Sequence, residues 1–561
     1  MAISELITFD GGMSTKTSPH LIGRNEGIIC ENVDLEKGTL YPLKPFQFTK
    51  TVNGRHIYNY EDTIIANQEY ADDRFYEEYG GRLYWTNGGF DNGLRKFDDT
   101  LPDINIGALA EAPDGLTDAE VGQITMAYDA AITGRLTKSG VYTYAFTIID
   151  SSGIESAPVI RTSEVDLVNK NNAAIKMSIS LSSFTAWQTA HPTMVGINIY
   201  RTGGDNPTFN LLVESLSPSS DGVWTDATNA YWADTIADIN VSRIELTTFE
   251  NIPPPDNIDM LLEIKGTLWA SWGKKVYFSQ TGSPEFWGAL DYITLDKTCT
   301  GIGKFGDSVL AFTKTSSYII NGNNRDNVSI QRLPFNQGCI SKHSIVNIDA
   351  YLVWASMNGI CLFDGSNVQV ITKKTLAWDE FGRLGNTSYD SYGDSEKWSS
   401  GSGFDIKYAV GYQDKYYGVF NGGIVIIDIA NGLKVSSIGL EDVVSVSYNY
   451  EDNFLYAVVE NGDATYDVYA QLGQDGLMEA TWKTGRISEG SVNVKKHYRR
   501  IEIDGSPTSV TIYVDGIRVY YIEKQNRFFL PAGISGLDIQ FEIKTSTEIR
   551  GMKYEYSVLK A

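Results

Sequence analysis

The stretch YLVWASMNGICLFDGSNVQVIT, residues 351 to 372, predicts three short strands separated by a Gly turn and an Asp-Gly turn. Both faces of this meander are apolar, because Leu352, Val353 and Trp354 follow one another in the first strand. A three-stranded sheet with two apolar faces needs a packing partner on each side, either copies of itself or another sheet. Copies of this pattern are therefore expected elsewhere in the chain.

Four further segments repeat the plan of strand, turn and strand. Corresponding residues in three units lie 42 residues apart, and the next two follow after 64 and 44 residues. A period near 42 with several short strands per unit is typical of a β-propeller, in which each blade is covered on both faces. The alternative is an antiparallel β-rich chain whose strand pairs are loosely spaced. The corresponding residues are Val276, Tyr318, Ile360, Ile424 and Val468, and the four segments are 261–287, 309–333, 416–438 and 453–472.

Strand patterns near the beginning, at 55–69 and 81–89, predict a further meander that closes the ring with distant parts of the chain. Such closure removes exposed sheet edges, which otherwise favour association. The segments 140–158 and 195–216 do not follow the blade pattern: they show alternating strand residues and hairpin turns, which predict an inserted β-sandwich. The stiff segment IPPPD at 252–256 marks the end of this module.

We therefore expect an all-β chain: a β-propeller with an inserted fibronectin- or immunoglobulin-like sandwich and a carboxyl-terminal β region. Alternating strands around Asp515-Gly516 predict that the last region is either a final blade or a small sandwich. The expected division is 1–109, an amino-terminal segment that contributes strands to the propeller; 110–250, the inserted module; 251–481, propeller blades; and 482–561, the carboxyl-terminal region.

The composition excludes several classes of function. Seventy acidic and 46 basic residues give a net charge of −24, which opposes tight binding to nucleic acid. The four cysteines are far apart and suggest neither a zinc site nor a disulfide framework, so the cytosol is the expected folding compartment. A secretion signal would have basic residues followed by an apolar core near the start of the chain, but Glu5 and Asp10 lie there, so no such signal is expected. No run of about 18 apolar residues occurs, so no membrane-spanning helix is expected.

No motif for catalysis or cofactor binding is present. The five histidines lack metal-binding spacing, and GxSxG, P-loop and Rossmann patterns do not occur, so we expect no enzyme activity, no metal and no cofactor. The segment SPSSDGVWTD, residues 217 to 226, resembles the sialidase Asp-box only faintly, because Trp224 follows Asp221 too closely. An edge hairpin turn is the simpler interpretation.

One long segment, 376–404, mixes aromatic residues with Asp, Ser and Gly. Long loops on a rigid scaffold often carry contacts, and such rings suit sugar stacking or a protein interface, although a plain surface loop has the same composition. The candidate interaction residues are Trp378, Tyr389, Tyr392 and Trp398.

The opening segment, residues 7 to 46, resembles the start of tail nozzle proteins of short-tailed bacteriophages, also called tail tubular or tail hub proteins. The resemblance rests on a strand, a Gly-Gly pair, a Pro-containing stretch, an Glu-Asn pair, and Gly-Thr-Leu followed by Pro. The later phrases GVYTYAFTIIDSSGIESAP, INIYRTGG and SPEFWG are similar too. The matching residues are Phe9, Gly11, Gly12, Pro19, Asn32, Gly38 and Leu40.

This resemblance implies a structural, non-catalytic protein of the virion tail, made in the bacterial cytoplasm. It implies a hexamer below the portal and adaptor that contacts fibres or spikes and forms the end of the channel for genomic DNA. Two alternatives remain: a host-glycan-binding propeller and a polysaccharide-degrading propeller enzyme, which would need two facing carboxylates.

Overall fold

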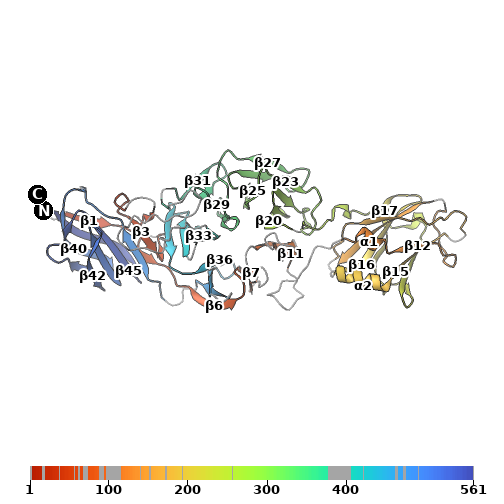
Figure 1. The fold of residues 1–561 in the computed structure, drawn as a ribbon, viewed down its shortest axis with the longest axis horizontal. Helices are drawn as coiled ribbons and strands as arrows, with labels where there is room; N and C mark the ends of the chain where they lie inside the picture. The colour runs from red at the N-terminus through yellow and green to blue at the C-terminus, as the bar shows by residue number, and fades with distance from the viewer. Residues whose placement is uncertain are drawn as a thin grey trace.

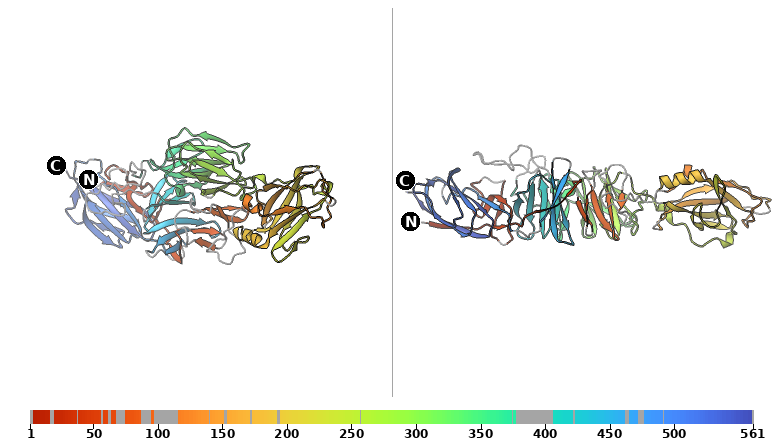
Figure 2. Two further views of the ribbon diagram at one scale, coloured as in Figure 1. Left: turned by 45° about the vertical axis from the view of Figure 1, so that its right-hand side comes forward. Right: turned by 90° about the horizontal axis from the view of Figure 1, so that it is seen from below.

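Three β bodies lie in a row along the chain's longest axis in the computed structural model (Figure 1). A terminal sandwich holds both chain ends, a propeller lies in the middle, and the inserted sandwich lies at the far end; the view from below shows the same order (Figure 2). The structure describes residues 3–559 except 16–18, 37, 56, 61–62, 67–73, 87–93, 97–114, 139, 151–152, 171–172, 192–193, 256, 374, 377–405, 421–422, 462–464, 472–475 and 491.

The propeller consists of sheets arranged around one axis. Within the described residues, four sheets have four strands each, β32–β35 are the propeller part of a ten-stranded sheet, β9–β11 form a three-stranded sheet, and β7 and β8 form a pair. The strands are β6 (Gln47–Val52), β7 (Ile57–Tyr60), β8 (Thr63–Ala66), β9 (Phe75–Tyr79), β10 (Arg82–Thr86), β11 (Leu94–Lys96), β20 (Asp259–Ile264), β21 (Thr267–Trp272), β22 (Lys275–Phe278), β23 (Tyr292–Thr294), β24 (Gly301–Phe305), β25 (Ser308–Phe312), β26 (Ser317–Asn321), β27 (Ser329–Arg332), β28 (Val346–Ile348), β29 (Tyr351–Ser356), β30 (Gly359–Phe363), β31 (Val368–Val370), β32 (Tyr408–Tyr412), β33 (Lys415–Phe420), β34 (Gly423–Asp428), β35 (Lys434–Ile438), β36 (Val443–Asn449), β37 (Phe454–Glu460) and β38 (Tyr466–Ala470).

Each sheet packs against a neighbour on both faces, which explains the two apolar faces of residues 351 to 372. On β29, Leu352 and Trp354 pack against the sheet of β24–β27, whereas Val353 and Ala355 pack against the sheet of β32–β35. All four side chains are fully buried. The predicted fold class, a β-propeller with an inserted β-sandwich and a carboxyl-terminal β region, is confirmed.

The blades have four strands, within the three or four short strands per unit that the period of 42 residues predicted. The spaced residues were expected in the second strand of each unit, but they lie in the third strand: Ile360, for example, is in β30, after β28 and β29. The first strand of this blade, β28, has no clear sequence pattern because it has only three residues and lacks a long apolar run. All five spaced residues lie in equivalent strands, namely β22, β26, β30, β34 and β38.

The ring closes through strands from opposite ends of the sequence. β6 pairs antiparallel with β38, so an amino-terminal strand completes the blade of β36–β38. Ile57 of β7 then packs against that blade, and Tyr58 stacks on Tyr76 of β9 with ring centroids 5.2 Å apart. β9 in turn lies against β20, which begins the run of consecutive blades.

The terminal sandwich is built from both ends of the chain. One sheet has the order β1-β46-β40-β43, with β44 on β40, and the other contains β2, β3, β39, β45, β41 and β42. Its elements are β1 (Ile3–Ile7), β2 (Gly12–Met13), β3 (Glu26–Glu31), β4 (Val33–Asp34), β5 (Tyr41–Pro42), β39 (Ala480–Thr484), β40 (Lys496–Gly505), β41 (Ser509–Val514), β42 (Ile517–Glu523), β43 (Arg527–Phe529), β44 (Ser535–Gly536), β45 (Ile539–Thr545) and β46 (Ile549–Val558).

One of these sheets is continuous with a propeller blade. β3 pairs antiparallel with β39 of the sandwich and parallel with β35 of the blade, so ten strands form a single sheet from β32 to β42. The expected segment 1–109 is thus divided: its first strands belong to the sandwich and only β6 to β11 belong to the propeller. The region 482–561, expected as a blade or a sandwich, lies in the sandwich.

The inserted module has two four-stranded sheets packed face to face, in the orders β12-β15-β19-β18 and β14-β13-β16-β17. No helix in the described part of the chain is long and apolar enough to cross a membrane. The elements are α1 (Asp118–Val121), β12 (Thr125–Ala127), β13 (Tyr142–Asp150), β14 (Val159–Thr162), β15 (Ile175–Ser180), α2 (Leu181–Ala190), β16 (Met194–Gly203), β17 (Asn206–Leu216), β18 (Trp224–Thr225), β19 (Asn229–Asp234), and the short 3-10 turns η1 (Asp238–Asn240) and η2 (Thr248–Glu250).

A carboxyl group lies where the closing sheet β9–β11 meets β20. Burial raises the pKa of Glu77 to about 8, and a hydrogen bond from the Glu263 backbone and the charge of Lys304 oppose the shift only in part. The folded protein therefore favours neutral Glu77, while the unfolded chain ionises near pH 4.5. The stability that this preference contributes is present at low pH and is lost as the pH rises to about 8.

Replacing Glu77 with Gln should stabilise the chain at pH 8, because Gln remains neutral. We expect a gain of ~2 kcal/mol in the free energy of unfolding at pH 8 and almost none at pH 5. Urea titrations at pH 5 and pH 8 measure the free energy of unfolding of this variant. The control is Glu451→Gln, because Glu451 lies exposed on a turn. An equal gain at both pH values would contradict this role for Glu77.

Candidate functional site

The interaction loop predicted from sequence lies outside the described residues. Trp378, Tyr389, Tyr392 and Trp398 all fall between 377 and 405, so their prediction stays a prediction. Among the residues that the structure does describe, no group of three or more His, Cys, Asp or Glu side chains could hold a metal ion. The features that remain are the propeller axis, the junction between the bodies and the inserted module.

A histidine bridges two separate blades of the propeller. The turn η3 (Lys342–Ser344) precedes β28, and the ring of His343 stacks on Phe75 at 4.1 Å and on Tyr408 at 4.3 Å between ring centroids. Phe75 belongs to β9 and Tyr408 to β32, and the inner strands β20, β24 and β28 separate the two along the ring. One imidazole therefore bridges two blades that are not neighbours.

The neighbouring lysine fixes this turn to a third blade. Lys342 Nζ lies 2.7 Å from Asp259 Oδ2 at the start of β20, and 5.6 Å from the centre of the Phe75 ring. Both side chains of the ion pair are largely buried. A partly buried ion pair with a cation–π contact orders the turn more strongly than an exposed pair would. The sequence carried no signal for this arrangement, because its parts come from four separate segments.

Removing the ring of His343 should loosen the propeller. We expect His343→Ala to lower the free energy of unfolding by ~1–3 kcal/mol, because two ring contacts are lost and a space is left between Phe75 and Tyr408. His343→Phe keeps a ring of similar size between Phe75 and Tyr408 and should remain close to the original protein. Chemical denaturation of both variants provides the measurement, and equal losses would contradict a stacking role.

The segment that carries the family resemblance forms the junction between the sandwich and the propeller. Phe9 is fully buried and meets Trp482 of β39 edge to face, with centroids 5.4 Å apart. Gly12 has a φ of 76°, and a Cβ there would lie 2.9 Å from the Val435 backbone nitrogen of β35. Glycine is therefore needed at position 12, where the chain passes close to the blade.

Asn32 joins the two bodies directly. Its Nδ2 donates to the Glu479 carbonyl 3.0 Å away, before β39, and its Oδ1 accepts from the Gly439 backbone nitrogen at 2.8 Å, after β35. Its own backbone N–H donates to the Ser437 carbonyl at 2.7 Å. Asn32 has a φ of 59°, which Asn tolerates better than most residues. One side chain thus holds a sandwich strand and a blade strand together.

Asn32→Ala tests this bridge. The variant loses two hydrogen bonds of a buried side chain and keeps the left-handed backbone, so the free energy of unfolding should fall by ~2–4 kcal/mol. Asn169 has a similar φ of 63° but is exposed on the inserted module, so Asn169→Ala measures the backbone effect alone. Losses of equal size in denaturant titrations would show that the bridge contributes nothing.

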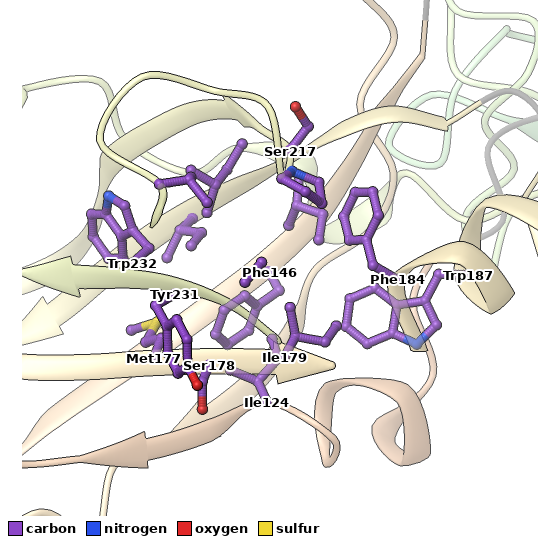
Figure 3. A pocket seen from close by; sticks show the side chains of 16 residues that line it. Ile124, Phe146, Met177, Ser178, Ile179, Phe184, Trp187, Ser217, Tyr231 and Trp232 are labelled. Carbon is purple, nitrogen blue, oxygen red and sulfur yellow. The ribbon is translucent and has the colours of Figure 1, made fainter. Parts of the chain in front are cut away.

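The inserted module contains a small cavity between its two sheets. Its volume is about 50 Å³, and Phe184 and Trp187 reach toward it from α2 (Figure 3). The cavity lies beside the loop 217–223, where the sheet edge β18 is only two residues long. A cavity of ~150 Å³ is needed to hold a single benzene ring, so this space is too small for a sugar ring or a nucleotide. We interpret it as incomplete packing at a short strand.

Comparisons with known proteins identify no family. No family model matches the chain, and no curated protein matches it. AztD of Citrobacter koseri aligns with 8% identity and a TM-score of 0.25, over 72% of this chain and 99% of that chain. The WD40 domain of Pan2 from Neurospora crassa aligns with 11% identity and a TM-score of 0.23, over 42% and 82% of the two chains. The fold assignment rests on the sheets of this chain.

Proposed function

We propose that this chain is a structural subunit of a bacteriophage tail, a nozzle protein of which six copies surround the tail axis below the adaptor. The observation that carries the proposal is the role of the opening segment. Phe9, Gly12 and Asn32, which resemble the tail nozzle family, are the residues that join the terminal sandwich to the propeller. The residues that carry the resemblance thus lie at the junction of two bodies, which supports a role for them in the architecture of the molecule.

The contacts of His343 bear on where DNA could pass. Its ring joins Phe75 and Tyr408 from blades that are not neighbours, so a duplex would pass between copies of the chain and not through one propeller. Six copies at −24 each carry −144. A lumen of like charge repels phosphates over a Debye length of ~8 Å at physiological salt, which lets a duplex slide without binding.

The proposed role is non-catalytic, with no cofactor. The partners are five further copies, the adaptor, tail fibres or spikes, and the DNA that moves through the lumen; the location is the virion tail after synthesis in the bacterial cytoplasm. The described residues offer no observation in favour of a polysaccharide-degrading enzyme. The large spacing between the two end bodies suits a subunit that meets different partners at its two ends (Figure 1).

Assembly with the adaptor of the same phage tests the proposal. Native mass spectrometry and negative-stain imaging of the mixture should show six copies of this chain in a ring on the adaptor. Duplex DNA should bind the ring no more tightly than millimolar at physiological salt, measured by fluorescence anisotropy over a salt series. A chain that stays monomeric with the adaptor, or micromolar binding that weakens steeply with salt, would overturn the nozzle assignment.

A further inference from the structure

The outer face of one sheet in the inserted module carries an aromatic surface. Residues paired across neighbouring strands share a face, and Trp224 of β18 pairs with Tyr231 of β19, which pairs with Ser178 of β15. Lys176 lies two residues from Ser178 and therefore on the same face. The neighbours Trp232 and Met177 point to the other face, into the sandwich core. Two rings, a hydroxyl and an ammonium group thus lie together on the outside.

The two rings are nearly parallel and accessible. Their centroids are 5.9 Å apart and their planes differ by 18°. The side chain of Trp224 is 42% exposed, although tryptophan favours burial. Lys176 Nζ lies 4.4 Å from the centre of the Tyr231 ring and 3.4 Å from Asp129 Oδ2, so the ring is held beside a fixed cation.

Asp226 orders this surface from the turn between β18 and β19. Its Oδ2 accepts a 2.5 Å hydrogen bond from Tyr231 Oη, and its Oδ1 accepts from the backbone nitrogens of Thr228 and Asn229. The bond from Tyr231, then those from the two backbone groups, hold the pKa of Asp226 well below its usual range. The carboxylate therefore stays charged and fixes the tyrosine ring before any ligand arrives, which lowers the entropy loss on binding.

The chemistry of this surface selects a class of ligand. The faces of aromatic rings carry negative partial charge and attract the C–H groups on the apolar face of a pyranose ring. Sugar hydroxyls need nearby acceptors and donors, and Asp226 Oδ2 retains a lone pair while Ser178 and Lys176 offer donors. A nucleic acid is disfavoured by the net charge of −24, and an apolar protein segment would leave these polar groups unpaired.

We propose that this surface, formed by Trp224, Tyr231, Asp226, Lys176 and Ser178, binds carbohydrate. A pyranose ring stacks on the exposed face of Trp224, and its hydroxyls bond to Asp226 and Ser178. The bound class is a polysaccharide that exposes successive pyranose rings, since one stacking contact alone is weak. This binding site does not depend on the nozzle assignment, because a free monomer carries the complete surface.

The experiment uses the full chain and a panel of soluble polysaccharides: dextran, yeast mannan, laminarin, arabinoxylan and bacterial lipopolysaccharide. Affinity electrophoresis and calorimetry should detect binding to at least one of them. Trp224→Ala should weaken that binding tenfold or more. Trp272→Ala is the matched control, because Trp272 is 44% exposed on a propeller blade, and it should leave the affinity unchanged.

Two further variants separate stacking from folding. Trp224→Phe keeps a ring and should retain more affinity than Trp224→Ala, while Tyr231→Phe removes only the hydrogen bond to Asp226 and should weaken binding severalfold. Thermal melts of each variant should match the original protein. The proposal is overturned if no polysaccharide in the panel binds, if Trp224→Ala binds as tightly as Trp272→Ala, or if the surface binds a tail protein instead. Ring assembly on the adaptor does not depend on these binding results. The carbohydrate-binding proposal and the nozzle proposal can therefore be contradicted independently of each other.

Discussion

The architecture depends on hydrogen bonding between the first fifty residues and strands more than four hundred residues later. β6 completes the blade of β36–β38, and β3 lies between β35 and β39. Each pairing covers a sheet edge that would otherwise present unpaired backbone groups. The entropy lost on closing so long a loop is only slightly larger than for a shorter loop, because this loss grows with the logarithm of the loop length. Once closed, the ring has no free end from which a blade can separate.

The pairing of β3 also explains why the propeller and the terminal sandwich form one unit. A ten-stranded sheet crosses from one body to the other, and its core is shared: Tyr416 of the blade and Trp482 of the sandwich belong to the same buried cluster. Separating the bodies would expose that core and break a row of backbone hydrogen bonds. Asn32 lies at this crossing, which gives a physical reason for an asparagine with positive φ at this position.

The sequence predicted the features that leave a repeated local pattern. Residues such as Val276, Tyr318 and Ile360 recur because each blade buries the same strand, so the period, the blades and the closing role of the amino-terminal strands could be inferred. The join of β3 to β35 could not, because a single parallel pairing has no local signature. The same holds for His343, whose partners lie in distant segments. Trp224 was noticed only for its resemblance to an Asp-box, and its pairing with Tyr231 required the register of β18 and β19.

The two end bodies differ in how they are attached to the propeller. The terminal sandwich continues a blade through backbone pairing, whereas hydrogen bonds and an ion pair link the end of the inserted module to the blades of β20–β23 and β24–β27. Gln280 Nε2 donates to the Glu250 carbonyl at 2.7 Å, the Trp287 backbone N–H donates to the Ile252 carbonyl at 2.7 Å, and Arg325 lies 3.4 Å from Glu250. An exposed ion pair contributes ~0–1 kcal/mol, far less than a shared core. Relative motion is the default for domains joined in this way. A surface such as that of Trp224 and Tyr231, carried on this module, can therefore turn toward a ligand while the propeller and the terminal sandwich stay fixed within an assembly.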